Sequence, residues 1–597
     1  MIDADCLSFA QMLEWTLVYW TTTNKLGAAM VELDKLTFSE EWFKDEVREG
    51  FFVPEMMKRF WAAQLVVLSE IDKICKRHDI KWYADMGTLI GTIRHKGYIP
   101  WDDDFDISML RDDWERFFEY ARQELPKEYK ILTVEDEEQY TLALGRITNG
   151  TTINLEKEHL DKFYGCPYVT GVDIFPMDKI YNDSEKEEER RDRGNDVLKA
   201  CSILAARGTE DKELLALLLK IEKANNTKLP RNYKLARALI VLLDKILKEC
   251  RDEDAKEVAS MYVWITEHWA KNPIEVYQEG KEAPFEHTIV TVPTRYHELL
   301  TNYYGDYMTV KRGSGVHNYP CYGEQEHRLK EHLGHNPFRY TLDKQSFDVK
   351  RKHPKQIDEL QSSLQLLENT RAGLEAAASQ GQSADAEALL QKNIEMTATI
   401  EKLIEEKKNG KKTVLFMPCR AKWWESMRPL YRKAVSDENV ETYVIPIPFY
   451  DCDHNGNVGE RHDERDLFMA DEHFTSFDEF DLAGIHPDVI VIQVPYDGES
   501  YSMTVPDKLY SEELLKYTDE LVYIPCFDVI DPVSDTDPVA ISLKTFIEQP
   551  AVVNADKVVL KSEKIRDLYI RVLTELAGEK TRSYWEEKIV LLENYKF

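Results

Sequence analysis

The densest group of residues able to do chemistry is an acidic run in the first third of the chain, where Asp102, Asp104 and Asp106 alternate with one further Asp and a Phe. In an extended segment alternate side chains project to the same face, so the sequence predicts three carboxylates side by side. Two carboxylates ~4 Å apart repel each other by about 4 kcal/mol at an effective dielectric near 20, so this face needs a cation or a proton. Carboxylate oxygens prefer hard cations, which predicts Mg2+ or Mn2+.

Two other features precede the acidic run within about twenty residues. Gly87 and Thr88 form a turn that can bring backbone N–H groups close to a phosphate, and Arg94, His95 and Lys96 add positive donors. A lone Asp cluster is most often a solvated loop, and either of the other features alone would be weaker still. Their conjunction favours a site for phosphoryl transfer, in which positioning and charge neutralisation supply most of the catalysis.

The elements that must position these residues follow from the apolar pattern. From Pro54 onward, apolar residues recur every three or four positions, which predicts a helix that ends near His78 and Asp79. Residues 80–84 are β-prone, and a strand is expected around 105–109. The predicted order is helix, strand, glycine turn, short helix and acidic strand.

The segment from Asp85 to Ile107 resembles the signature of the LicD/fukutin-type family, a GTLLG turn followed by RHxGxIPWDDDxD. Residues 171–178 (GVDIFPMD) look like the DIFPLD block of that family, and residues 299–308 (LLTNYYGDYM) look like its closing segment. The resemblance covers approximately residues 55–335. It implies a nucleotidyltransferase-like fold and a metal-dependent reaction that moves a phosphorylated headgroup from a CDP-activated donor to a sugar hydroxyl.

The resemblance also implies roles for individual residues. The metal ligands would be Asp102, Asp104, Asp106 and Asp173, of which Asp104, Asp106 and Asp173 are also expected to be catalytic, and the substrate-binding residues would be Gly87, Thr88, Arg94, His95, Lys96 and Arg146. Met86 departs from the Gly or Ala that the family commonly has before the glycine turn, which leaves the shape of that turn open.

Changes in sequence pattern along the chain predict several domains. The expected fold class is an α+β nucleotidyltransferase-like catalytic domain with a helical insertion, a helical hairpin linker and a C-terminal α/β Rossmann-like domain. The predicted ranges are 1–53 for an N-terminal helical extension, 54–340 for the catalytic domain, 182–260 for its helical insertion, 355–409 for the hairpin and 412–597 for the C-terminal domain. Apolar residues in a heptad rhythm indicate the hairpin, which is either a spacer or a dimer seam.

The C-terminal domain shows short apolar runs, each followed by a helical stretch, which is typical of a parallel α/β sheet. No GxGxxG or P-loop motif accompanies it. Residues 412–597 faintly resemble the N-terminal half of CDP-glycerol glycerophosphotransferases of the teichoic-acid type, which would make them half of a GT-B-like fold. The other half of that family carries the nucleotide site and has no room here, so we expect no independent transferase site. Loops at 451–455 and 496–498 are read as ordinary loops or as acceptor contacts.

Composition narrows the classes of partner and compartment. The 597 residues include 77 Lys and Arg against 109 Asp and Glu, a net charge of -32, which disfavours nucleic acid as a partner. Nine cysteines are scattered without a CxxC, which predicts a reducing compartment. No basic secretory n-region and no long apolar stretch are evident, so we expect a cytoplasmic protein, at the inner face of the membrane where its acceptor is lipid-linked.

These observations predict a phosphotransferase that moves phosphocholine or a polyol phosphate from a CDP-activated donor to a glycan or lipid-linked glycan, a precursor of a cell-surface polysaccharide. Two alternatives stay open at this point. One is a nucleotidyltransferase that makes a CDP- or NDP-activated compound, and the other is a non-catalytic glycan-binding protein. Peripheral membrane association and a homodimer are both compatible with the sequence.

Overall fold

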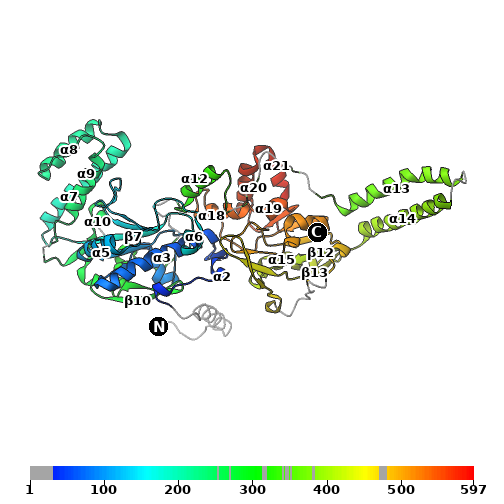
Figure 1. Ribbon diagram of the computed structural model, residues 1–597, viewed down its shortest axis with the longest axis horizontal. Helices are drawn as coiled ribbons and strands as arrows, with labels where there is room; N and C mark the ends of the chain where they lie inside the picture. The colour runs from blue at the N-terminus through cyan, green and yellow to red at the C-terminus, as the bar shows by residue number, and fades with distance from the viewer. Residues whose placement is uncertain are drawn as a thin grey trace, which may run out of the picture. The chain divides into compact units, whose positions relative to one another are not determined.

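The computed structural model describes residues 31–251, 254–267, 271–311, 319–338, 353–379, 384–468 and 480–597, together with residues 340, 342, 349 and 477. The chain divides into two compact units that are considered separately (Figure 1). The first comprises the chain up to Ser39 and Met56–Gln325, and the second comprises Glu40–Glu55 and Glu326–Phe597. Both combine helices with β-sheets, so the mixed α and β content that the sequence predicts is confirmed.

The first unit is built on a mixed sheet of seven strands: β3 (Tyr83–Ala84), β4 (Asp106–Leu110), β5 (Lys130–Leu132), β6 (Gly145–Thr148), β7 (Gly171–Lys179), β8 (Glu257–Ser260) and β9 (Lys271–Pro273). Their order is β3-β4-β7-β6-β5, and β8 joins the far end of β7 and pairs with β9. The long strand β7 is parallel to β4 and antiparallel to β6 and β8. Strand β7 therefore joins three other strands into one sheet.

Helix α3 (Glu55–His78) confirms the helix predicted after Pro54, and it ends where Asp79 adopts a left-handed φ of 49°. Most of its side chains are buried. Two of them fix the acidic run, because Trp61 Nε1 donates to the carbonyl of Asp102 at 3.0 Å and Gln64 Nε2 donates to that of Asp103 at 2.9 Å. The helix thus holds the backbone from which the carboxylates project.

Short elements surround this core. They are α4 (Met86–Ile90), the π-helical turn η3 (Gly91–His95), α5 (Arg111–Glu124), α6 (Lys157–Lys162), η4 (Ile274–Tyr277), the hairpin β10 (Gly280–Phe285) with β11 (Thr288–Pro293), α11 (Tyr296–Tyr304) and α12 (Gly323–Leu333). Single-turn π segments inside helices are frequent at functional sites, and η3 carries the basic residues of the family-like signature.

A helical insertion follows β7 and consists of α7 (Ser184–Arg207), α8 (Lys212–Ala224) and α9 (Leu235–Leu247), with α10 (Met261–Thr266) packed beside α7. Buried aliphatic side chains such as Val197, Leu214 and Leu243 form its core. The sequence placed the end of the insertion at residue 260. Residues 257–260 instead form β8, because they pair with β7 and so belong to the sheet.

The second unit contains a six-stranded sheet in which all strands are parallel: β12 (Lys412–Met417), β13 (Val440–Val444), β16 (Val489–Ile492), β18 (Glu520–Tyr523), β19 (Lys557–Leu560) and β20 (Ile589–Leu591). The order is β13-β12-β16-β18-β19-β20. The short apolar runs that predicted a parallel sheet are these buried strands. These strands are connected by the helices α15 (Trp424–Val435), α18 (Pro538–Ile547), α19 (Pro550–Asn554), α20 (Glu563–Ala577) and α21 (Arg582–Lys588), with the short α16 (Leu482–Ile485) and α17 (Ser511–Leu514).

The N-terminal segment differs from the helical extension that the sequence suggested. Residues 1–30 lie outside the described residues. From there to Val53 the chain forms a 3-10 turn (Leu33–Lys35), α2 (Glu40–Phe43) and an antiparallel hairpin of β1 (Glu46–Arg48) and β2 (Phe51–Val53). The hairpin belongs to the second unit, because the ring of Phe52 packs on Phe527 and Phe546. A further small sheet, β15 (Val458–His462), β14 (Phe449–Cys452) and β17 (Met503–Thr504), completes this unit.

Helices α13 (Gln356–Ser379) and α14 (Ala384–Asn409) lie side by side in the region predicted as a hairpin (Figure 1). Asn393 donates to the carbonyl of Leu367 across the pair, while Leu366 and Leu389 are more than half exposed. The exposed leucines leave both readings, spacer and dimer seam, in place. Of the helices in the described part of the chain, none is both long enough and apolar enough to cross a bilayer.

Candidate functional site

The acidic run is an extended loop that leads into β4, and the strand itself begins only at Asp106. Asp106 stands opposite Asp173 in the parallel pairing of β4 with β7, so two carboxylates predicted from separate motifs lie on neighbouring strands. The side chain of Asp103 has a different partner, since its carboxylate accepts the backbone N–H of Cys321 at 2.6 Å. Asp103 thus holds the backbone at Cys321, although its charge still acts on Asp102.

Asp102 and Asp106 each lie close to other acids. Burial raises the pKa of Asp102 well above its usual range, and the neighbouring Asp104 and Asp103 raise it further. Burial also raises the pKa of Asp106, with added contributions from Asp104, Asp173 and Asp102. The loop and the start of β4 thus bring Asp102, Asp104, Asp106 and Asp173 into one electrostatic group, called here the acidic cluster. A proton or a cation would relieve its repulsion.

Asp173 of the acidic cluster has a strong cationic partner. Arg146 stands opposite it in the pairing of β6 with β7, and two hydrogen bonds join them, one from Nη2 to Oδ2 at 2.6 Å. This ion pair raises the pKa of Arg146, although burial alone would lower it. Arg146 was predicted to bind substrate, and in the structure it offsets the charge of Asp173.

The glycine turn shapes the acidic cluster directly. A Cβ atom at Gly87 would lie 2.6 Å from Oδ2 of Asp102, so only glycine leaves room for that carboxylate. The hydroxyl oxygen of Thr88 accepts the backbone N–H of Asp106 at 2.8 Å and so holds the start of β4. Met86 has a left-handed φ of 47°, a conformation that costs little for Gly and more for other residues. That is the position at which the sequence departs from the family pattern.

The basic stretch is arranged differently from the prediction. Nη1 of Arg94 donates to the carbonyls of Tyr307 and Thr309, at 2.7 and 3.2 Å, and so ties η3 to the YGDYM segment. Nζ of the exposed Lys96 donates to the carbonyl of Ile93. The ring of His95 lies edge-on to Trp101, at 6.2 Å between centroids. These contacts give the three residues positioning roles, and their contact with a substrate phosphate stays a prediction.

Two polar residues near the acidic cluster were not singled out from the sequence. Asp85 is fully buried, caps α4 through the N–H of Met86, and accepts a long hydrogen bond from the hydroxyl of Tyr277. Burial raises the pKa of Asp85 to about 6. Burial likewise raises the pKa of Tyr304, and the aspartates of the cluster add to the effect. The available signals were the position of Asp85 before the glycine turn and of Tyr304 within the family-like closing segment.

Asp178 of the same sheet is a buried acid with a cation beside it, although burial still raises its pKa. Asp178, five residues after Asp173 on β7, receives two hydrogen bonds from Arg111, at 2.7 and 2.8 Å. The same guanidinium reaches Asp244 of α9 at 3.1 Å. This arrangement ties the helical insertion to the sheet, so the last aspartate of the DIFPMD block has a structural role.

The donor types of the acidic cluster suit a hard divalent cation, because all of them are carboxylate oxygens. Within the described ranges, no three or more His, Cys, Asp or Glu side chains converge closely enough to form a ready-made metal site. Binding a cation would therefore require the carboxylates of the acidic loop to draw closer together.

Comparison with known proteins places these features in a family context. Residues 79–195 match the model described as the LicD/FKTN/FKRP nucleotidyltransferase domain. The chain is 32% identical over 256 residues to the lipopolysaccharide cholinephosphotransferase LicD of Haemophilus influenzae, a match that covers 41% of this chain and 89% of that protein. An uncharacterised protein of Rickettsia typhi is 28% identical over 164 residues, which cover 26% of this chain and half of that protein. The family match does not extend into residues 412–597, whose resemblance to CDP-glycerol transferases stays a prediction.

Proposed function

The chain belongs to the LicD family of phosphotransferases, and we propose that it transfers phosphocholine from CDP-choline to a hydroxyl group of a cell-surface glycan precursor. The relative from Haemophilus influenzae is named as a lipopolysaccharide cholinephosphotransferase, and the chain spans most of its length. Phosphocholine is therefore the first headgroup to test, and polyol phosphates are the next.

The observation that carries this proposal is the position of Asp102 and Asp106 beside other acids of the cluster. All four of its carboxylates lie within residues 79–195, the segment that matches the family model. Two of them have raised pKa values because they are buried near other acids. Uncompensated buried carboxylates are costly, so their presence in a well-packed unit favours a functional purpose over a structural one.

We propose that Asp102, Asp104 and Asp106 hold Mg2+ or Mn2+, with Asp173 as a further ligand once its contact with Arg146 loosens. A bound cation would neutralise charge on the phosphates of the donor, which is the main requirement of phosphoryl transfer.

The residues around the acidic cluster would then position the reactants. The hydroxyl oxygen of the acceptor forms a bond to the phosphorus that carries choline, the bridging bond to CMP breaks, and the hydroxyl proton passes to a carboxylate of the cluster. Gly87 leaves space beside Asp102, and Thr88 fixes Asp106. Arg94 holds the YGDYM segment in place from the other side. A transfer of this kind depends more on geometry than on a covalent intermediate.

The finer features of the fold fit the same proposal. We interpret the mixed sheet of the first unit as a nucleotidyltransferase-like arrangement, in which adjacent strands present carboxylates to a nucleotide. We interpret the parallel sheet of the second unit as Rossmann-like, because its order, with β12 and β16 at the centre of the reversal, is that of the flavodoxin-like doubly wound folds.

The decisive experiment incubates the full chain with Mg2+ and CDP-choline, CDP-glycerol or CDP-ribitol, and follows CMP by mass spectrometry. We expect CMP release from CDP-choline, accelerated by a glycan acceptor. Turnover of a different CDP compound alone would replace the headgroup but keep the reaction class. Release of pyrophosphate from CTP, without CMP release from any CDP donor, would contradict transfer and identify a nucleotidyltransferase.

A further inference from the structure

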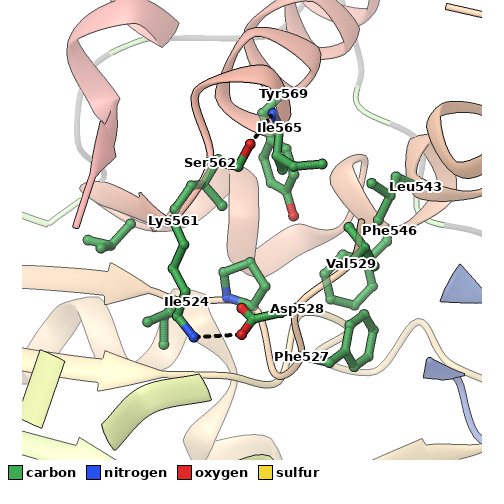
Figure 2. A pocket seen from close by; sticks show the side chains of 13 residues that line it. Ile524, Phe527, Asp528, Val529, Leu543, Phe546, Lys561, Ser562, Ile565 and Tyr569 are labelled. Carbon is green, nitrogen blue, oxygen red and sulfur yellow. Dashed lines mark hydrogen bonds and ion pairs between the residues drawn. The ribbon is translucent and has the colours of Figure 1, made fainter. Parts of the chain in front are cut away.

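The second unit contains a cavity that plays no part in the reaction proposed above. It has a volume of about 230 Å3 and opens at the carboxyl ends of the parallel strands β18 and β19 (Figure 2). The loops that follow these strands form two of its walls, and α18 and α20 form the others. Open parallel sheets bind small molecules at the carboxyl ends of their strands, so the position is suited to a ligand.

The walls of the cavity are mainly apolar. Ile524 and Val529 contribute from the loop after β18, Leu543 and Phe546 from α18, and Ile565 from α20. The hairpin of β1 and β2 supports this side, because Phe52 packs on Phe546. The volume lies somewhat below the roughly 300–1,000 Å3 of pockets for drug-sized ligands. A ligand must therefore be small and largely apolar on its faces.

One buried polar group points into this apolar space. Tyr569 of α20 is 1% exposed, and Figure 2 shows its hydroxyl directed into the cavity. Among the described residues, no side chain or backbone group forms a hydrogen bond with that hydroxyl. Because this hydroxyl faces the cavity, a ligand with a polar atom at its deep end can form a hydrogen bond with it.

Charges at the mouth limit the ligand further. Nζ of Lys561 forms an ion pair with Asp528 at 2.8 Å, and the hydroxyl of Ser562 donates to Asp531. Glu563 follows in the first turn of α20. Lys564 follows Glu563, so three carboxylates stand beside two ammonium groups, and this excess of negative charge disfavours an anionic ligand such as a phosphate. The exposed carboxylate of Asp528 is instead a good acceptor for hydroxyl groups.

We propose that this cavity binds an uncharged nucleoside. A nucleobase has two apolar faces for the aliphatic and aromatic walls, and polar atoms along its edge for the hydroxyl of Tyr569. The ribose then extends to the mouth, where its hydroxyl groups donate to Asp528, as ribose hydroxyls do with carboxylates in dinucleotide-binding folds. The proposal does not depend on the transfer reaction, since all the residues concerned lie between 524 and 569 in the second unit.

The test is equilibrium binding of adenosine, cytidine, guanosine and uridine to the full chain, measured by calorimetry and by ligand-observed NMR. The informative variant is Tyr569→Phe, which removes only the hydroxyl. Tyr523→Phe is the matched control, because Tyr523 is a second buried tyrosine of the same unit and does not line the cavity. We expect saturable binding of at least one nucleoside, weakened about 3- to 10-fold in Tyr569→Phe, as for a lost neutral hydrogen bond, and unchanged in Tyr523→Phe.

Two outcomes would overturn the proposal. The first is the absence of saturable nucleoside binding, or binding that is equal in Tyr569→Phe and the wild type. The second concerns charge: the 5′-monophosphate of whichever nucleoside binds should bind more weakly than the nucleoside itself. Tighter binding of the monophosphate, lost in Tyr569→Phe, would assign the cavity to an anionic ligand and contradict the reading of its mouth.

Discussion

Asp106 on β4 and Asp178 on β7 are both buried acids of one sheet, but different charges lie beside them. Asp178 is held by Arg111 through two hydrogen bonds, and that guanidinium also reaches Asp244. Burial raises the pKa of both acids, but Arg111 opposes the rise at Asp178, whereas Asp104 and Asp173 add to it at Asp106. The pair of Arg111 and Asp178 fastens the helical insertion to the sheet through Asp244, whereas the acids around Asp106 are those that we propose to bind a cation. The balance of charge around a buried acid, more than its sequence motif, separates structural from functional aspartates here.

The largest expected effect on activity comes from Asp106→Asn, which removes one charge of the acidic cluster with almost no change in volume. We expect kcat for CMP release from CDP-choline to fall roughly 100- to 1,000-fold, as for the loss of a main electrostatic group. Thermal stability should be kept or increased, because repulsion with Asp104 and Asp173 is relieved. Asp103→Asn is the control within the same loop, since the carboxylate of Asp103 accepts a hydrogen bond from the backbone N–H of Cys321. Similar losses of activity in both variants would contradict the different roles given to these two acids.

The largest expected effect on stability comes from Arg111→Met, which leaves Asp178 buried without its cation. Breaking a buried ion pair from one side costs about 3–5 kcal/mol, and urea unfolding should show a loss of that size. Arg116→Met is the control, because Arg116 pairs with Asp113 at the surface; it should change stability by no more than about 0.5 kcal/mol. A small loss of unfolding free energy in Arg111→Met would contradict the structural role of Asp178.

Asp85→Asn tests a third buried acid, one with no cation beside it, through the pH dependence of stability. Burial raises the pKa of Asp85 from 3.8 to about 6, so the fold favours its protonated form. The resulting stabilisation is complete below pH 3.8 and is lost as the pH rises through 6, an effect of about 3 kcal/mol. Asn cannot ionise, so the free energy of unfolding of the variant should gain on the wild type between pH 4 and 7. Parallel pH curves would contradict the raised pKa.

The smallest expected effect comes from Gly87→Ala, which sharpens the geometry of the acidic cluster. The new methyl group would meet Oδ2 of Asp102 at 2.6 Å and displace that carboxylate. We expect about a tenfold loss of activity, close to 1.4 kcal/mol, together with a higher requirement for Mg2+ and little change in stability. Gly150→Ala, where the nearest atom lies 4.0 Å away, should behave like the wild type. Unchanged metal dependence in Gly87→Ala would place Asp102 outside the cation site.

Local patterns in the sequence predicted much of the fold and the principal acids. Helix α3 repeats its apolar positions over many turns, and the acidic residues stand within five consecutive positions, so both could be found without tertiary information. The pairing of Arg146 with Asp173 could not, because it depends on the register of β6 and β7. The contacts of Arg94 with the carbonyls of residues 307 and 309 likewise join segments more than 200 positions apart.

The structural role of Asp178 and the cavity around Tyr569 were also beyond the sequence, for a related physical reason. Asp173 and Asp178 stand on one strand in one family-like block, and only the position of Arg111 distinguishes them. The hydroxyl of Tyr569 is a candidate ligand contact only because loops and helices form a mainly apolar cavity around it. Charge balance and burial are properties of the assembled unit, so motif reading could identify candidates but could not rank them.

Binding of Mn2+ to the full chain, measured by electron paramagnetic resonance, tests the central claim that the acidic cluster forms a cation site. We expect saturable Mn2+ binding that competes with Mg2+, is strongly weakened in Asp104→Asn and Asp106→Asn, and is retained in Asp103→Asn. Absence of saturable binding in the wild type, or equal affinity in Asp106→Asn and the wild type, would contradict it.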